Sequence, residues 1–362
     1  MSAHEIVILV MAVFALLGAA DRILGNRFGL GKEFEEGILA MGSLAMAMLG
    51  IISLAPVLAA VLRPVVVPVF GFLGADPAMF AGTILACDMG GGALAAEMTV
   101  DPEAALLGGV ITGSMLGATI VFTIPVAMGI LREEDRPAMA KGILCGIVTI
   151  PVGILVGGLV AGFSLGMVLR NLLPIVIIGL LIALGLWRAE DAMVRGFSVF
   201  GKAVITVVTI GLAAAIVEEL TGIVLIPGMA PLSEGFATVG AIAIVLAGAF
   251  PLVAVVTKIL RKPLLKLGKQ MGIDDVGAAG LIATLANSIA TFGMVKDMNY
   301  RGKVVNIAFA VSAAFVFGDH LGFTAGFAPQ MLPAMIAGKL AGGISAVVVA
   351  LWLTRKTGNT YG

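Results

Sequence analysis

The residues with the clearest chemical potential in this chain lie inside an apolar segment, 78–97, around the stretch CDMGGG. Asp88 stands beside Gly90, Gly91 and Gly92, so an ionisable carboxylate and a run of helix-breaking residues fall at mid-length. A carboxylate inside a membrane is costly unless it is paired or solvated, and it marks a functional site by default. We therefore predict that Asp88, with Gly90 and Gly91, forms a binding site for a small organic cation. The structural alternative is that Asp88 accepts hydrogen bonds from free backbone N–H groups at the break.

A second polar interruption occurs in the apolar segment 277–295, where Asn287 and Ser288 follow the run GLIATLA. Their amide and hydroxyl groups are suited to bind a hydroxyl group of a substrate. The equally weighted alternative is a polar cap for a helix that is broken at this point.

The stretch GDHLGF, residues 318–323, places Asp319 and His320 together late in an apolar segment. A histidine can change its charge near neutral pH, so coupling of transport to protons is one interpretation. A helix end at the membrane surface is the other. Lys339 lies near the middle of the last apolar segment and needs an acidic partner, for which we expect Asp319 in a supporting role.

Several kinds of site are not indicated by the sequence. With two histidines and two cysteines in 362 residues, we expect neither a catalytic metal centre nor a disulfide framework. No phosphate-binding loop of the GxxxxGK[ST] type occurs, and no catalytic dyad is visible, so we expect no cofactor and no enzyme activity. The net charge is zero, which gives no reason to expect a nucleic-acid partner.

The composition requires that these polar residues be positioned by membrane helices. Hydrophobic residues make up 60% of the chain and charged residues only 12%, whereas soluble domains are less apolar and about 25% charged. Apolar segments long enough for a bilayer recur throughout. We identify eleven of them, at 5–22, 36–61, 78–97, 103–131, 142–163, 170–187, 203–225, 235–258, 277–295, 304–325 and 330–353.

The Lys and Arg residues between these segments predict the topology, because cytoplasmic loops carry an excess of positive charge. If all eleven segments crossed the membrane, strongly basic loops would face both sides. The conflict disappears if 78–97 and 277–295 enter and leave on the same side. The sequence therefore predicts an all-α polytopic protein with about nine transmembrane helices, two re-entrant hairpins, an outer N-terminus and a cytoplasmic C-terminus.

An internal repeat supports this topology. Residues 36–98 align with 234–296 without a gap, matching for example Gly37 with Gly235 and Asp76 with Asp274. The predicted topology orients the two copies oppositely, as in many secondary transporters whose sites lie near the midplane. We expect one integrated membrane domain with an N-terminal repeat in 1–162 and a C-terminal repeat in 163–362.

Several longer blocks give a more specific indication. FGLGKEFEEG (28–37), LACDMGG (85–91), ATLANSI (283–289), RGKVVN (301–306) and AFAVSAAFVFGDHLGF (308–323) together closely resemble the ethanolamine-utilisation transporter family. The resemblance covers nearly the whole chain and implies a protein of the bacterial inner membrane that moves ethanolamine into the cytoplasm. Family members carry two aromatic residues where this chain has Gly92-Ala93, and an Asn where it has Ser288.

The resemblance and the topology lead to one functional hypothesis with one alternative. We expect a secondary carrier in which the two hairpins give access from opposite sides in turn, with Asp88 holding the protonated amine. The alternative is a channel-like facilitator of ethanolamine or another small amine. The partners that this requires are ethanolamine and the lipid bilayer; assembly into a homo-oligomer is compatible with it but not required.

Overall fold

The computed structural model describes residues 2–355, and that part of the chain is helical without strands. The α-helices are α1 (Ala3–Ile23), α2 (Leu30–Phe72), α3 (Ala78–Ile84), α4 (Gly91–Met98), α5 (Pro102–Leu106), α6 (Ile124–Ile130), α7 (Arg136–Ile147), α8 (Ile150–Val160), α9 (Leu165–Arg188), α10 (Glu190–Thr221), α11 (Leu232–Met271), α12 (Asp275–Ala286), α13 (Ser288–Met294), α14 (Tyr300–Ala313), α15 (Asp319–Phe327) and α16 (Leu332–Leu353). Short 3₁₀ turns are η1 (Cys87–Met89), η4 (Glu133–Asp135), η5 (Val295–Asp297) and η6 (Pro329–Met331), and two π-helical stretches are η2 (Leu107–Gly117) and η3 (Thr119–Thr123).

Eight helical stretches of the described chain are long and apolar enough to cross a bilayer, which makes this a multi-pass membrane protein. They are His4–Ile23, Leu30–Phe72, Pro102–Ile130, Glu133–Val160, Leu165–Arg188, Glu190–Thr221, Leu232–Ile259 and Pro329–Leu353. These correspond to eight of the nine segments expected to cross.

The ninth expected crossing, 304–325, is not one continuous helix. It is divided into α14 and α15 by a non-helical stretch, 314–318, in which Phe315 has a left-handed backbone with φ of 62°. The backbone N–H groups freed by this break donate to carbonyls of α12, from Phe315 to Thr284 at 3.2 Å and from Phe317 to Leu285 at 2.9 Å. Non-helical backbone at membrane depth requires such internal partners.

Both expected hairpins are broken where polar residues interrupt the apolar sequence. Segment 78–97 forms α3, the turn η1 and α4, and segment 277–295 forms α12 and α13 with Asn287 between them. The positions of both breaks are thus as the sequence predicted.

The base of each broken segment is closed by an aspartate. Asp76, before α3, accepts hydrogen bonds from the backbone N–H groups of Ala78 (2.8 Å), Val100 (3.1 Å) and Asp101 (3.1 Å). Asp274, before α12, accepts them from Gly277 (2.7 Å) and Asn299 (2.6 Å). Each aspartate therefore caps the first arm and holds the N-terminus of the helix that follows the second arm, which brings the two ends of the segment together.

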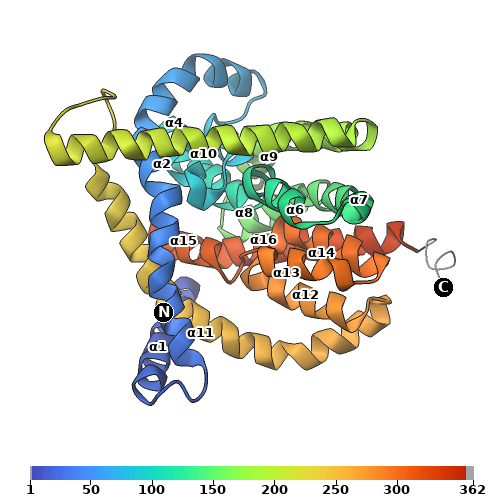
Figure 1. The fold of residues 1–362 in the computed structure, drawn as a ribbon. Coiled ribbons are helices and arrows are strands. Elements are labelled where there is room, and N and C mark those ends of the chain that lie inside the picture. Colours follow the sequence, from blue (N-terminus) through green and yellow to red (C-terminus); the bar gives the residue numbers. More distant parts are fainter. Residues whose placement is uncertain (1, 356–362) are drawn as a thin grey trace.

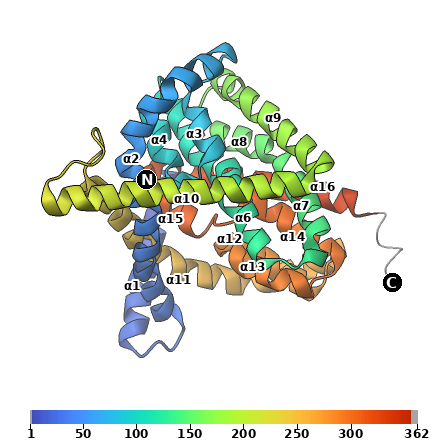
Figure 2. The same ribbon diagram turned by 45° about the horizontal axis from the view of Figure 1, so that its top comes forward.

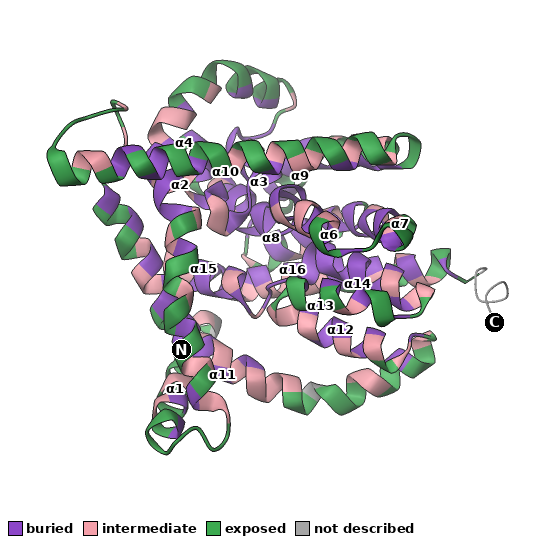
Figure 3. Cartoon of the chain, in the orientation of Figure 1, coloured by how far each residue is buried: buried purple, intermediate pink, exposed green. Residues whose placement is uncertain are grey.

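The long helices α2 and α11 form the frame against which these segments pack. Both are bent, with Pro56, Pro64 and Pro68 inside α2 and Pro251 and Pro263 inside α11. Figures 1 and 2 show α2 crossing α11 on one side of the molecule, with α10 lying across α2. Figure 3 shows the buried residues concentrated in the interior around α3, α8, α14 and α16, while α1, α10 and α11 expose residues outward.

Candidate functional site

The turn between α3 and α4 places Asp88 at the edge of a cavity. Leu85 and Ala86 are extended, the chain then turns through η1, and Gly90 starts α4 with φ of 96°. A Cβ atom at Gly90 would lie 2.1 Å from Cγ1 of Ile51, so both the backbone angle and the space require glycine here. Gly91 donates its N–H to the carbonyl of Ala86 at 2.9 Å and so closes the turn.

The opposite wall of the cavity comes from the break between α14 and α15. This break supplies Phe315, Asp319 and His320, which are distant from Asp88 in the sequence. The helix α15 begins at Asp319, so Asp319 and His320 belong to its first turn.

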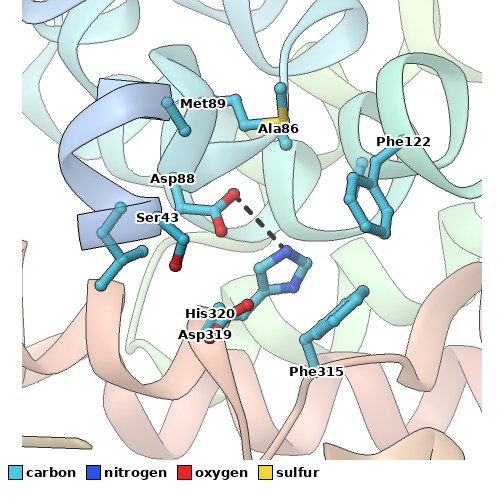
Figure 4. Close-up of a pocket in the computed structure, with 11 residues that line it drawn as sticks. Ser43, Ala86, Asp88, Met89, Phe122, Phe315, Asp319 and His320 are labelled. Atoms are coloured by element: carbon cyan, nitrogen blue, oxygen red, sulfur yellow. Dashed lines mark ion pairs between the residues drawn. The ribbon is translucent and has the colours of Figure 1, made fainter. Parts of the chain in front are cut away.

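The cavity between these elements has a volume of about 160 Å³. It is lined by Ser43, Leu44, Ala47, Ala86, Asp88, Met89, Ala118, Phe122, Phe315, Asp319 and His320. Figure 4 shows Asp88 and Ser43 on one side, Phe122 and Phe315 on the other, and His320 between them. Three of the residues predicted from sequence, Asp88, Asp319 and His320, are thus brought together in one site.

A polar chain leads from the cavity into the core. Oδ1 of Asp88 lies 3.7 Å from Nε2 of His320, and Nδ1 of His320 lies 2.9 Å from Nζ of Lys339. Lys339 also donates to the backbone carbonyl of Ser114 in η2. Because Lys339 contacts Nδ1 of His320, the other ring nitrogen, Nε2, is the one that faces Asp88.

Comparison with known proteins agrees with this membrane-embedded site. The family model described as "Ethanolamine utilisation protein, EutH" matches residues 3–353. The chain belongs to the EutH family. A protein of Listeria monocytogenes named "Probable ethanolamine permease EutH" is 59% identical over 98% of this chain and 95% of its own length.

Two further relatives extend this comparison. The Escherichia coli protein with the same name is 46% identical over 99% of this chain and 98% of its own length. The "Uncharacterized protein YxeR" of Bacillus subtilis is 55% identical over 98% of this chain and 96% of its own length. No solved structure matches this EutH family member.

The expected partnership of Lys339 with Asp319 is wrong. Lys339 is 1% exposed, and in the described chain its ammonium contacts His320 and Ser114 instead. The reason is register: His320 follows Asp319 directly on α15, and it is His320 that faces α16. His320 therefore stands between the lysine and the carboxylate of Asp88.

The other predicted polar pair lies outside the cavity. Oδ1 of Asn287 accepts a hydrogen bond from the N–H of Ile289 at 2.8 Å and caps α13, and the Asn287 residue is exposed. Ser288 is buried, and its hydroxyl has no hydrogen-bond partner within residues 2–355. Neither residue lines the cavity of Asp88 in this conformation.

The side chains of Cys87, Asp88 and His320 approach one another closely enough to suggest a metal site. One potential ligand atom of each lies within 4.8 Å of the others. Nε2 of His320 is the nitrogen that faces Asp88. A metal ligand needs a free lone pair at that nitrogen, so an ion could bind there only when Nε2 carries no proton.

The aromatic residues of the site were not identified from the sequence. Phe122 lies in an apolar run within a π-helical stretch, and Phe315 lies in the apolar run SAAFVF, three residues before Gly318. An aromatic residue at position 92 would require the ring of Phe323 to move, because a Cβ atom there would lie 2.6 Å from its Cζ. The rings of Phe323 and Phe327 stack in that space with centroids 4.9 Å apart.

Proposed function

We propose that this protein is a permease that carries ethanolamine, as the protonated amine, across the cytoplasmic membrane into the cell. The observation that carries the proposal is a small cavity, buried between broken helices, that contains two carboxylates, Asp88 and Asp319. Membership of the EutH family and the printed names of its relatives, "Probable ethanolamine permease EutH", support the choice of substrate.

Charge balance favours a monovalent cation. When both carboxylates and Lys339 are ionised and His320 is neutral, one negative charge remains in the cluster. An uncompensated charge in a buried site is strongly unfavourable. An ammonium group that binds at Asp88 restores neutrality.

The polar groups of the cavity also suit the rest of the ethanolamine molecule. Ethanolamine is a short chain with an ammonium at one end and a hydroxyl at the other. With the ammonium at Asp88, we assign the hydroxyl to Asp319, a carboxylate that no protein donor engages within the described residues. The separation of 3.7 Å between Asp88 and His320 is longer than a hydrogen bond, so Asp88 is available to the ligand.

We propose further that the two broken segments are re-entrant hairpins of an inverted repeat. Asp76 and Asp274, the residues that tie the ends of each segment, are 198 positions apart, and so are the helix N-caps Asp101 and Asn299 and the helix starts Pro102 and Tyr300. The same shift aligns the two halves of the sequence. In this proposal the base of the first hairpin lies outside and the base of the second lies in the cytoplasm, as the distribution of Lys and Arg predicts.

Two cavities on either side of the first hairpin tip support a carrier mechanism. Asp88 and Met89 line the cavity already described, whereas Cys87 and Gly90 line a second one of about 200 Å³. The second cavity also contains Glu97 and Glu234, whose carboxylates attract cations. A shift of the tip between these cavities would expose Asp88 to the two sides in turn.

The decisive test is Asp88→Asn, assayed by uptake of labelled ethanolamine into proteoliposomes. Loss of a charged hydrogen-bond partner costs about 1.5–3 kcal/mol. We therefore expect the ethanolamine concentration at half-saturation to rise about 10- to 100-fold, or uptake to disappear. The control is Asp297→Asn, which removes an exposed carboxylate outside the cavity. Near-normal uptake by the Asp88 variant would refute the assignment.

A counterflow assay distinguishes the carrier from the alternative mechanism, a channel-like facilitator. Proteoliposomes loaded with unlabelled ethanolamine should take up external label faster than empty ones if the protein is a carrier. Equal initial rates would favour the channel. Repeating the assay with imposed pH and sodium gradients would show whether Lys339 and His320 couple transport to an ion.

A further inference from the structure

We propose that Phe315, paired with Phe122, binds the ammonium group of the substrate through the face of its ring, and that the second hairpin holds it in place. This inference rests on the proposed function, because it concerns how the same cavity holds a cation. It gives the second hairpin a part in the site that does not require Asn287 or Ser288 to touch the substrate.

The first observation is the backbone of Phe315. Its φ of 62° lies in the left-handed region, and Asn26 is the other non-glycine residue with positive φ among residues 2–355. Asparagine tolerates this conformation, but for a bulky residue it is a true outlier. Such strain persists where the surroundings impose it, and it concentrates at functional sites.

The second observation is what imposes the strain. The N–H of Phe315 donates to the carbonyl of Thr284, and the N–H of Phe317 donates to that of Leu285. Both carbonyls belong to the end of α12, the first arm of the second hairpin. The hairpin tip therefore fixes the backbone on which the Phe315 ring stands.

The third observation is where the strained backbone places the ring. Phe315 is 5% exposed and lines the cavity of Asp88 together with Phe122. The two ring centroids are 5.4 Å apart with planes at 81°, and the Phe315 centroid is 5.3 Å from that of His320. In an edge-to-face pair the edge of one ring meets the face of the other, and Figure 4 shows both rings directed toward the cavity, across from Asp88.

Cation chemistry explains why two aromatic rings lie opposite a carboxylate. The negative face of an aromatic ring attracts an ammonium group, and the attraction grows when water is excluded. A hydroxyl-bearing alkylammonium ion in this cavity would have Asp88 on one side and ring faces on the other. The same walls favour the charged amine over neutral molecules of similar size.

The test replaces Phe315 with phenylalanine analogues carrying one, two and three ring fluorines, introduced by nonsense suppression. Fluorination weakens the ring's attraction for cations while nearly preserving its shape. We expect the dissociation constant for ethanolamine, measured on the purified protein, to rise stepwise, reaching about tenfold with three fluorines. The matched control is the same series at Phe317, which belongs to the same break but does not line the cavity.

Each outcome decides the proposal. A flat series at position 315, in a protein that binds ethanolamine in an Asp88-dependent way, overturns the ring contact and leaves the proposed function standing. An equal rise at positions 315 and 317 shows a structural effect and also overturns it. Failure of the wild-type protein to bind ethanolamine removes the proposed function and this inference together. Phe315→Leu, which keeps apolar bulk, should weaken binding at least as much as three fluorines.

Discussion

The two broken segments of this EutH family member, which we propose to be re-entrant hairpins, share a frame but differ at their tips. In the first, α3 and α4 meet at a turn that directs Asp88 into a cavity. In the second, α12 and α13 meet at Asn287, whose side chain caps α13. The bases are nearly the same, because Asp76 and Asp274 each tie the start of a hairpin to the helix that follows it.

The difference teaches that the two copies of the proposed repeat share construction and not chemistry. The first hairpin contributes a charged side chain to the site. The second contributes carbonyl groups of Thr284 and Leu285, which hold the break that bears Phe315. The site is therefore asymmetric, although the two broken segments beside it are built alike at their bases.

The largest expected effect is on the side of the membrane from which a labelling reagent can reach each hairpin base. Cysteines placed at Val100, near the base of the first hairpin, and at Lys269 and Tyr300, near the base of the second, should react with a membrane-impermeant maleimide from opposite faces. We expect Val100→Cys to label in intact cells, and Lys269→Cys and Tyr300→Cys only after the membrane is opened. The native Cys87 and Cys145 are buried and give the background.

Labelling of Lys269→Cys and Tyr300→Cys from different faces would mean that segment 277–295 crosses the membrane. The comparison between the hairpins would then fail at its base.

An intermediate effect is expected from removing the two aspartates that close the hairpins. Asp76 is 4% exposed and accepts three backbone hydrogen bonds, so Asp76→Ala should lower the free energy of unfolding by about 3 kcal/mol. Asp274 is less buried and accepts two, so Asp274→Ala should cost about 1–2 kcal/mol. Thermal unfolding of the purified protein in detergent measures both.

The matched control for these variants is Asp275→Ala, which changes the neighbouring exposed aspartate and should leave the unfolding temperature nearly unchanged. If Asp274→Ala were as stable as this control, the second hairpin would not depend on its closing aspartate, and the shared frame would be limited to the first.

The sequence predicted the parts of this comparison that have local signals. Gly90 and Asp88 marked the first break and Asn287 the second, because glycine and polar residues interrupt an apolar helix visibly. The break at 314–318 ends at Gly318 and Asp319, which the sequence marked as a polar interruption. The left-handed backbone at Phe315 has no local signal, since it depends on N–H groups of the break that donate to the carbonyls of α12. The pairing of Lys339 with His320 could not be predicted either, because it depends on which face of α15 meets α16.

The smallest effect should come from Asn287, and it tests the asymmetry most directly. Asn287→Ala removes an N-cap, so we expect a loss of about 1 kcal/mol in stability and uptake within about twofold of wild type. Asn287→Asp keeps an equally good cap but lacks the amide N–H groups. It should therefore restore stability.

If instead both variants lose ethanolamine uptake, the amide of Asn287 must meet the substrate in another conformation of the transport cycle. The second hairpin would then carry chemistry of its own, as the sequence suggested. Normal uptake by both variants would mean that the tip of the second hairpin contributes only the backbone carbonyls that hold Phe315 against the cavity.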